Sequence, residues 1–377
     1  MKRTKNIVFM CSSVHVWTDT RIYYKEAQSL AENGLQVEFY ALDYPAEKRE
    51  IRNLTMHYLP NLSRRSRIQH QRTLWKAFQK SRAANFHFHD PELLFLAKKI
   101  KRKYGDQVKV VYDMHEHLPA AVRTKQWLPK FLRPILSQIV TKVERYLMKS
   151  VDAVIFAEKS YRENYPTESF TKIDILNYPI TPPVHNVKKN KIFTMIYVGG
   201  LTEQRGLFNM LNLAATLKEK GVSDFQLKLI GPVLTAETKI KNFVRKKHLE
   251  EHVVQFDRLP YTEIWQHYHT SHLGLCLLHP TPNNLNSRST KLFEYMAAGL
   301  PVLASDFSSF IEMMTTHKSG YTADPFDSSL LADLVCQVKN NPELAEQLGK
   351  NGEKAFFENY SWHGEAEKLM ALYDERK

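Results

Sequence analysis

Short apolar runs alternate with longer amphipathic stretches from one end of the chain to the other. Helical stretches such as Ile22–Asn33, which ends at Gly34, separate the apolar runs. A β–α rhythm with apolar, β-branched strands predicts a parallel sheet covered by helices on both faces. In the first half, the predicted strands are Ile7–Cys11, Val37–Ala41, Met56–Leu59, Phe86–His89, Val108–Tyr112 and Val154–Phe156.

The rhythm restarts after a proline cluster at residues 179–183. We therefore expect residues 179–190 to link two Rossmann-like α/β domains, residues 1–178 and residues 191–360. Two doubly wound domains leave a cleft between the carboxyl ends of their sheets, where ligands of such sheets bind. In the second half, the predicted strands are Thr194–Val198, Gln226–Ile230, Val253–Phe256, Gly274–Leu278 and Val302–Ser305.

The composition fits this picture, since 377 residues with 43% hydrophobic and 25% charged residues suit two globular domains. Apolar runs stay well short of the roughly 20 residues that a membrane helix needs. The apolar residues 7–11 are too few for a signal peptide and are interpreted as a first strand. Three widely spaced cysteines, Cys11, Cys276 and Cys336, are typical of reduced thiols, so we expect a cytoplasmic protein.

The positive charge is concentrated in the first half of the chain. Residues 1–190 hold 33 Lys and Arg against 18 Asp and Glu, whereas residues 191–377 hold 20 against 22. The densest basic stretch runs from Arg64 to Arg82 with Leu74, Trp75 and Phe78 interleaved, and a second covers residues 98–103. These stretches are either solvated helix faces or a surface for anionic lipid or a phosphate-bearing acceptor. Nucleic acid is not expected as a partner because no nucleic-acid motif accompanies the charge.

A diglycine follows one predicted strand of the second half. Gly199 and Gly200 close the run Tyr197–Leu201, and Arg205 and Gly206 follow soon after. Glycine lets a backbone approach a phosphate closely, and Arg205 can add an always-charged contact. The same residues also suit a simple turn, so this pattern alone leaves both interpretations open.

A second charged pattern lies at a predicted helix start. Ser289 or Thr290 can cap a helix that stops at Gly299, which places Lys291 in the first turn. The helix dipole disfavours a cation there, and an anion bound by Lys291 and the free N–H groups would remove the conflict. Glu294 lies one turn deeper on the same face and can accept two ribose hydroxyls. The alternative is a Lys–Glu pair on an ordinary surface helix.

The stretch KLFEYMAAGLPV at residues 291–302 resembles the signature of glycosyltransferase family 4, the retaining GT-B nucleotide-sugar transferases. The run YVGGL…RG at residues 197–206 is similar to the phosphate-binding loop of that family. Residues 89–94 and 111–116 resemble segments of its bacterial polysaccharide-building members. The resemblance implies a GT-B fold in which the last helix, residues 361–377, crosses back onto the first domain.

The resemblance also implies roles for individual residues. Glu294 would bind the donor ribose, and Arg205 and Lys291 would hold the diphosphate. His115 would lie near the anomeric carbon, contacting the sugar or its leaving phosphate. The remaining expected donor-binding residues are Gly199, Gly200, Gly231, Leu259 and Leu292.

Two departures from the family pattern stand out. The family often carries a second Glu eight positions before the ribose Glu, where this chain has Asn286, which puts contacts to the sugar hydroxyls in doubt. The donor loop often has Arg at the position of Gly200 and Lys at that of Arg205. Charge for the diphosphate would then come from Arg205 and Lys291 alone.

The expected chemistry needs no metal and no cofactor. An Asp-x-Asp motif, which holds a metal in the other common transferase fold, is missing from the sequence. Arg205, Lys291 and a helix N-terminus can stabilise the departing diphosphate, each charge-assisted bond contributing about 1.5–3 kcal/mol. The resemblance implies retention of the anomeric configuration, with the leaving phosphate accepting the proton of the incoming hydroxyl.

Four more polar residues follow predicted strands of the first half and are candidates for the acceptor side. His89 and Asp90 end one strand, although Asp90-Pro91 also suits a capped helix start. Asp19 and Arg21 follow the first strand, although they also suit a salt-bridged helix start.

The predicted function is transfer of a sugar from a nucleotide diphosphate, a UDP-sugar in the first instance. The acceptor would be a glycan or a lipid-linked molecule in cell-envelope or exopolysaccharide synthesis, reached on the inner face of the membrane through the basic half. Two alternatives stay open. One is a nucleotide-sugar epimerase or hydrolase of the same fold, and the other is a non-catalytic sugar-nucleotide sensor, suggested by Asn286.

Overall fold

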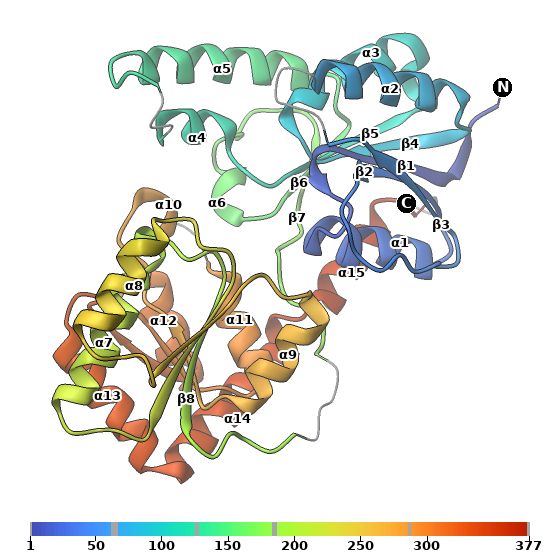
Figure 1. Cartoon of the computed structure of the whole chain (residues 1–377). Coiled ribbons are helices and arrows are strands. Elements are labelled where there is room, and N and C mark those ends of the chain that lie inside the picture. Colours follow the sequence, from blue (N-terminus) through green and yellow to red (C-terminus); the bar gives the residue numbers. More distant parts are fainter. Residues whose placement is uncertain (1, 62–66, 125–127, 183–186, 286–287, 375–377) are drawn as a thin grey trace. The chain divides into compact units, whose positions relative to one another are not determined.

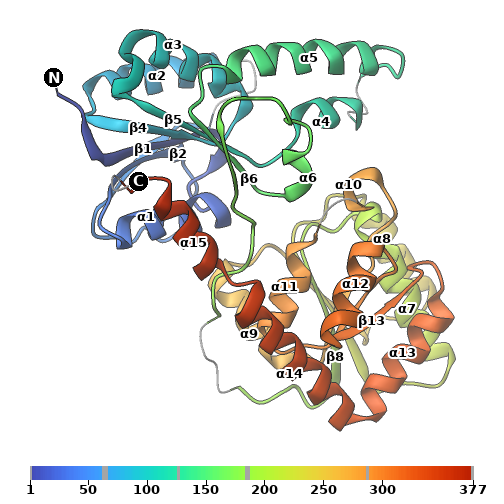
Figure 2. The ribbon, with the colours of Figure 1, turned by 180° about the vertical axis from the view of Figure 1, so that it is seen from behind.

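The computed structural model describes residues 2–61, 67–124, 128–182, 187–285 and 288–374. The chain divides into two compact units, one of Met1–Asn177 with Trp362–Lys377 and one of Tyr178–Ser361 (Figures 1 and 2). The expected linker, residues 179–190, falls in the second unit in this division, and its residues 183–186 lie outside the described residues. No helix among the described residues is long and apolar enough to cross a membrane.

The first unit is built on a sheet of seven parallel strands in the order β3-β2-β1-β4-β5-β6-β7. The strands are β1 Thr4–Val16, β2 Gln36–Leu42, β3 Leu54–Leu59, β4 Ala83–Phe88, β5 Lys109–Met114, β6 Ala153–Phe156 and β7 Thr171–Asp174. The helical segments are η1 Thr20–Ala27, α1 Gln28–Glu32, α2 Arg67–Lys80, η3 Pro91–Leu93, α3 Leu94–Tyr104, η4 Gly105–Gln107, α4 Leu118–Thr124, α5 Leu132–Met148, α6 Lys159–Arg162 and α15 Trp362–Ala371.

The second unit has six parallel strands in the order β10-β9-β8-β11-β12-β13. The strands are β8 Phe193–Val198, β9 Phe225–Ile230, β10 Val253–Phe256, β11 Leu273–Cys276, β12 Val302–Ser305 and β13 Gly320–Ala323. The helical segments are η5 Glu203–Arg205, α7 Leu207–Glu219, α8 Glu237–Lys246, α9 Tyr261–Thr270, α10 Pro282–Leu285, α11 Thr290–Ala297, α12 Ser308–His317, α13 Ser328–Asn340 and α14 Pro342–Asn359.

These two doubly wound sheets confirm the predicted α/β class and every predicted strand, with shifts of the strand ends that are largest for β1, which runs from Thr4 to Val16. Two edge strands, β7 and β13, went unpredicted because their sequences, TKID and GYTA, contain no apolar run. The predicted helix at Ile22–Asn33 starts earlier, at Thr20, as a π-helical segment and continues as α1. In both sheets the strand order reverses once, between β1 and β4 and between β8 and β11, and ligands of such sheets bind there.

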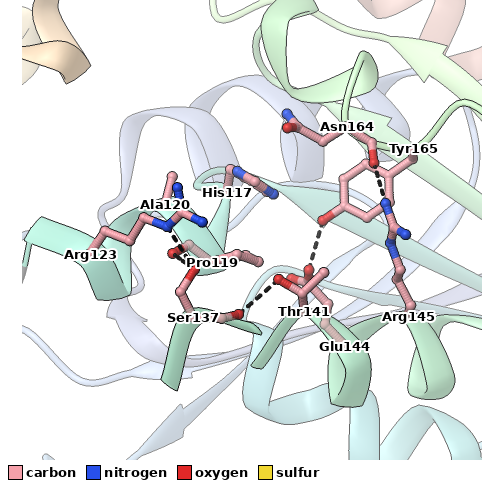
Figure 3. A pocket seen from close by; sticks show the side chains of 10 residues that line it. All are labelled: His117, Pro119, Ala120, Arg123, Ser137, Thr141, Glu144, Arg145, Asn164 and Tyr165. Atoms are coloured by element: carbon pink, nitrogen blue, oxygen red, sulfur yellow. Dashed lines mark hydrogen bonds between the residues drawn. The ribbon is translucent and has the colours of Figure 1, made fainter. Parts of the chain in front are cut away.

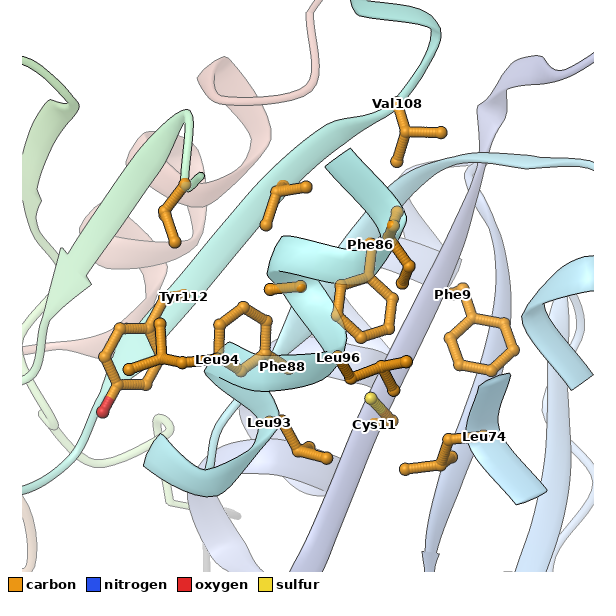
Figure 4. Packing of buried hydrophobic residues seen from close by; sticks show 14 of the residues in the cluster. Phe9, Cys11, Leu74, Phe86, Phe88, Leu93, Leu94, Leu96, Val108 and Tyr112 are labelled. Carbon is orange, nitrogen blue, oxygen red and sulfur yellow. The ribbon is translucent and has the colours of Figure 1, made fainter. Parts of the chain in front are cut away.

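Aromatic side chains on one face of the first sheet form its core (Figure 4). The ring centroids of Phe86 and Phe88 on β4 are 5.5 Å apart, and those of Phe88 and Tyr112 on β5 are 4.9 Å apart. Fully burying such a side chain contributes about 1.5–3 kcal/mol. Because side chains alternate along a strand, this packing turns His87, His89 and Asp113 toward the opposite face of the sheet.

The last helix belongs to the first unit, as the predicted fold requires. The indole Nε1 of Trp362 donates to Ser29 Oγ at 2.9 Å, and Leu176 N donates to Glu365 Oε2 at 2.7 Å. Helix α15 therefore packs beside η1 and α1 on the face of the sheet opposite the aromatic core (Figure 1).

Candidate active site

A glycine-rich loop follows β8 at the point where the strand order of the second unit reverses. Gly199 has a φ of 144°, and its N–H donates to Ile230 O at 2.8 Å. A side chain is strained at this positive φ, and a Cβ at Gly199 would also lie 2.7 Å from Lys291 Cε, so glycine is favoured at this position. A Cβ at Gly231, where φ is 139°, would meet Gly199 O at 2.2 Å. The two loops therefore pack backbone against backbone under the end of Lys291.

Gly200 and Leu259 occupy the neighbouring loops. Gly200 is buried, and a Cβ there would lie 2.9 Å from Leu234 Cδ1 and 3.6 Å from Arg205 Nη1. Leu259 is half-buried in the loop between β10 and α9. The N–H of Gly231 donates to Phe256 O at 3.0 Å, which ties the β9 loop to that segment.

Lys291 and Arg205 bring two positive charges to the same loop. Burial lowers the pKa of Lys291, and the charge of Arg205 lowers it further. The Nζ of Lys291 lies 5.3 Å from the ring centroid of Tyr197, while Arg205 is exposed. Two cations that disfavour each other's charge form a site that an anion would stabilise.

Helix α11 begins at Thr290, as predicted, so Lys291 lies in its first turn. The Ser289 side chain makes no capping hydrogen bond to this helix, while the backbone N–H of Leu292 donates to Ser289 O at 3.1 Å. The positive end of the helix dipole thus adds to the charges of Lys291 and Arg205.

Glu294 is half-buried one turn further along α11. Tyr268, from α9, donates its hydroxyl to Glu294 Oε2 at 2.7 Å, which orients the carboxylate. Glu294 also counteracts the lowering of the Lys291 pKa. The two residues are three positions apart on α11 and so lie on one face of the helix. Leu292 is fully buried and belongs to the packing face of α11 instead.

The corresponding strand ends of the first unit carry a buried charged network around Asp113, at the end of β5. Arg21 donates from Nε and Nη2 to the two oxygens of Asp113 at 2.9 and 2.7 Å. Arg21 Nε also lies 3.0 Å from Glu26 Oε1. Burial alone would raise the pKa of Asp113, but the charges of Arg21 and His115 hold it well below its usual value. Burial and the neighbouring Asp113 raise the pKa of Glu26.

Three histidines extend this network. His115 donates from Nε2 to Asp113 Oδ2 at 2.5 Å and is 17% exposed. His89 Nδ1 lies 3.2 Å from the same oxygen and 3.3 Å from His115 Nε2, and burial lowers the pKa of His89. The rings of His15 and His115 lie 5.4 Å apart. Asp113 is therefore placed to orient His115, the partly exposed member of the network.

The other acceptor-side candidates have structural partners. Asp90 Oδ2 accepts hydrogen bonds from Ser12 Oγ at 2.9 Å and from Ser13 N at 2.5 Å, and its side chain makes no helix cap. Asp19 caps η1 by accepting from the N–H groups of Arg21 and Ile22. The salt-bridged helix start foreseen as the alternative for Asp19 and Arg21 is therefore present.

One group among the described residues has the donors and the spacing to hold a metal ion, namely Glu26, His87, His89 and Asp113. Glu26, His87 and Asp113 are fully buried, and His89 nearly so. The guanidinium of Arg21 already contacts both carboxylates and supplies the positive charge that an ion would otherwise bring. A cation beside Arg21 would be repelled by it, so this group suits the arginine better than a metal.

Three residues that shape these clusters were not predicted as site residues. Asp113 lies inside the 111–116 segment, and its position two residues before His115 on the same strand face was the available signal. His15 is the residue before the last of β1 and lies four residues before Asp19, and its Nδ1 is 3.4 Å from Asp19 Oδ2. Tyr268 carries no local signal, since its contact with Glu294 joins two separate helices. Asn286 lies outside the described residues.

Comparison with known proteins agrees with this architecture. The family model described as glycosyl transferases group 1 matches residues 182–355, and that described as glycosyltransferase family 4 matches residues 20–170. The crystal structure of Anabaena HepE in complex with UDP has a TM-score of 0.69 at 12% identity, covering 99% of each chain. Two doubly wound units of this kind define the GT-B class of fold.

Relatives of known sequence are themselves glycosyltransferases. An uncharacterized glycosyltransferase of Methanocaldococcus jannaschii is 26% identical over 48% of this chain and 47% of its own length. The amylovoran biosynthesis glycosyltransferase AmsK of Erwinia amylovora is 26% identical over 44% of this chain and 42% of its own length. The matched part thus spans about half the length of these relatives. With both family models matched in succession, the chain belongs to the glycosyltransferase family 4 type of GT-B proteins.

Proposed function

We propose that this protein transfers a sugar, with retention of configuration, from a UDP-sugar to a glycan or lipid-linked acceptor in cell-envelope or exopolysaccharide synthesis. The observation that carries the proposal is the pair of like charges, Lys291 and Arg205, which lie beside the glycine loop after β8, with Lys291 in the first turn of α11. UDP in the complex of the HepE neighbour and the biosynthetic role in the name of AmsK support the donor and the pathway.

Each residue then has a task. Lys291, Arg205 and the first turn of α11 hold the diphosphate, and Glu294 accepts hydroxyls of the ribose. As the bond between the anomeric carbon and the phosphate oxygen breaks, the acceptor oxygen bonds to that carbon on the same face. The acceptor proton passes to the leaving phosphate. His115, oriented by Asp113, contacts the sugar or the leaving phosphate.

Donor binding tests the proposal directly. UDP-, GDP- and ADP-sugars are screened by thermal shift, since a ligand raises stability with the logarithm of its excess over Kd. We expect a UDP-sugar to stabilise the wild type and Glu294→Ala to lose most of that shift, while Glu251→Gln, an exposed control, keeps it. Unchanged UDP-sugar affinity in Glu294→Ala would remove the ribose assignment.

Turnover separates the transferase from its alternatives. An epimerase or hydrolase converts or cleaves the donor without an acceptor, and a non-catalytic sensor binds donor without consuming it. We expect nucleotide release to depend on an added acceptor and to persist in EDTA. Loss of activity in EDTA, restored by Mg²⁺ or Mn²⁺, would contradict metal-independent transfer.

We also propose that the first unit meets an anionic membrane, and that α5 provides the contact. In the densest basic stretch, Leu74 and Phe78 are fully buried in the core, and residues 64–66 lie outside the described residues. Helix α5 instead exposes an apolar stripe at intervals of three or four residues. The stripe consists of Phe131, Ile135, Ile139, Val143 and Tyr146, which are 42–75% exposed.

Cations adjoin this stripe. Lys142 on α5 and Lys149 just after its end are exposed, and Lys98 Nζ lies 3.6 Å from the ring centroid of Tyr146. An apolar stripe edged by lysine suits the surface of an anionic bilayer. We expect binding to anionic liposomes that falls as salt rises, and a further fall in Ile135→Ser/Ile139→Ser but not in Ile311→Ser, an exposed position of the second unit. No binding at low salt would discard this contact.

A further inference from the structure

A polar pocket of about 320 Å³ lies in the first unit (Figure 3). Asp113 and His115 are not part of its lining. Helices α4 and α5 and the segment after α6 contribute its walls. The residues that carry the argument are His117, Arg123, Ser137, Glu144, Arg145 and Tyr165.

Glu144 gives the pocket an unfilled hydrogen-bonding position. The residue is 2% exposed, and Tyr165 donates its hydroxyl to Glu144 Oε2 at 2.8 Å. Its other oxygen, Oε1, is buried and has no hydrogen-bond partner within the part of the chain that the structure describes. Because buried polar atoms are nearly always paired in folded proteins, Oε1 marks a place for a ligand group.

Two arginines make the pocket electropositive. Arg123 donates from Nε to Ser137 Oγ at 3.1 Å, and no ion pair to Arg123 is found among the described residues. Arg145 donates from Nη2 to Asn164 O at 2.9 Å and lies 3.3 Å from Glu168 Oε1. Burial lowers the pKa of His117, and the charges of Arg123 and Arg145 lower it further. The unpaired charge of Arg123 favours an anion.

The position of the pocket connects it with the proposed reaction. His117 follows His115 by two residues, in the same loop after β5. Helix α5 lines the pocket through Ser137 and Glu144, whereas its exposed apolar stripe includes Ile135 and Ile139. At about 100° per residue, these two sets lie on opposite sides of the helix. One helix thus serves the pocket on one face and the proposed membrane contact on the other.

We propose that this pocket binds an anionic sugar unit of the acceptor, with the negative group at Arg123 and a sugar hydroxyl at Glu144. The proposal rests on the proposed transferase function and names the chemistry of its acceptor. A phosphate ester and a uronate both present one anionic group beside hydroxyls, so the test has an arm for each.

Binding of small probes to the full chain provides the test. Glucose 6-phosphate, glucuronate and neutral glucose are titrated into the wild type, Arg123→Gln and Arg102→Gln by calorimetry or ligand-observed NMR. Arg102 is an exposed control on α3 outside the pocket lining. We expect one anionic probe to bind and Arg123→Gln to weaken it about tenfold or more, the size of a charge-assisted bond, with Arg102→Gln unchanged. The anionic probe that binds identifies the source of the charge.

A second variant examines Glu144. Burial raises the pKa of this carboxyl to about 7, against the lowering effects of the Tyr165 hydrogen bond and the Arg145 charge, and Tyr112 and His117 also face the region. Above that pH a carboxylate at this position repels the bound anion, whereas the amide of Glu144→Gln stays neutral. We expect affinity to fall from about pH 6 to about pH 8 more steeply in the wild type than in Glu144→Gln. The titration of the probe itself cancels in this comparison.

Three results would overturn the pocket proposal. They are equal binding of neutral glucose and the anionic probes, anion binding unaffected by Arg123→Gln, and absence of binding by any probe at millimolar concentration. The affinity for UDP is measured in the same variants and should not change. If the wild type does not bind UDP, the donor assignment is rejected and the pocket proposal is not affected. Failure of the donor site and failure of the pocket are therefore distinguishable.

Discussion

Each sheet gathers charged side chains where its strand order reverses, yet the two clusters are balanced in opposite ways. In the first unit, Arg21 is paired with Asp113 and Glu26 inside the fold, and burial there is nearly complete. In the second unit, Lys291 and Arg205 face the same loop, and each disfavours the charge of the other. In the first cluster, carboxylates of the protein neutralise the arginine. In the second cluster, the two positive charges would be neutralised by a bound anion.

The difference in charge balance suggests different roles for the two clusters. A neutralised buried network holds His115 in one orientation. In the proposed function, the unbalanced pair of cations in the second unit is the part that a bound diphosphate would stabilise. Removing one residue from each cluster should therefore change stability and binding in opposite ways.

The largest effect is expected for Asp113→Asn. The change leaves Arg21 buried without its bidentate partner, which costs about 3–5 kcal/mol of unfolding free energy. Urea denaturation measures the loss. Asp174→Asn, which breaks the more exposed pair with Arg162, is the matched control and should cost less than about 1 kcal/mol. Similar losses of unfolding free energy in the two variants would mean that the buried network stabilises the fold no more than a partly exposed ion pair does.

Lys291→Met should weaken UDP binding by about 10- to 150-fold, since one charge-assisted contact contributes about 1.5–3 kcal/mol. The free energy of unfolding should stay the same or rise, because the lysine charge is disfavoured by burial in the empty protein. Calorimetry with UDP and urea denaturation test both halves, with the exposed Lys246→Met as control. A clear loss of stability without a loss of UDP affinity would make Lys291 a structural residue.

Tyr373→Phe should have the smallest effect, about 1 kcal/mol of unfolding free energy. The Tyr373 hydroxyl lies 2.7 Å from His87 Nδ1 and connects the segment after α15 to the buried network. Urea denaturation reports the change, and donor binding should not respond. A loss near that of Asp113→Asn would show that this segment is an integral part of the network.

Much of the architecture was predictable because neighbouring residues carry the signal. The apolar runs predicted the interior strands, and the 291–302 stretch placed Lys291 in the first turn of its helix. The edge strands β7 and β13 escaped prediction because their sequences, TKID and GYTA, contain no apolar run, whereas the other two edge strands, β3 and β10, were predicted. The sequence did not predict the group with the spacing of a metal site either, because its members come from three separate segments. They are Glu26, His87, His89 and Asp113.

The sequence by itself determined the α/β class, the interior strands, the start of α11 and the glycines that let Lys291 reach its loop. Tertiary structure alone decided that Arg21 meets Asp113 across 92 residues and that Tyr268 orients Glu294. It also brought His89 Nδ1, just after β4, to 3.2 Å from Asp113 Oδ2 at the end of β5. The physical reason is that periodicity and capping act between neighbours along the chain, whereas charge pairing depends on strand order and register, which bring distant residues together.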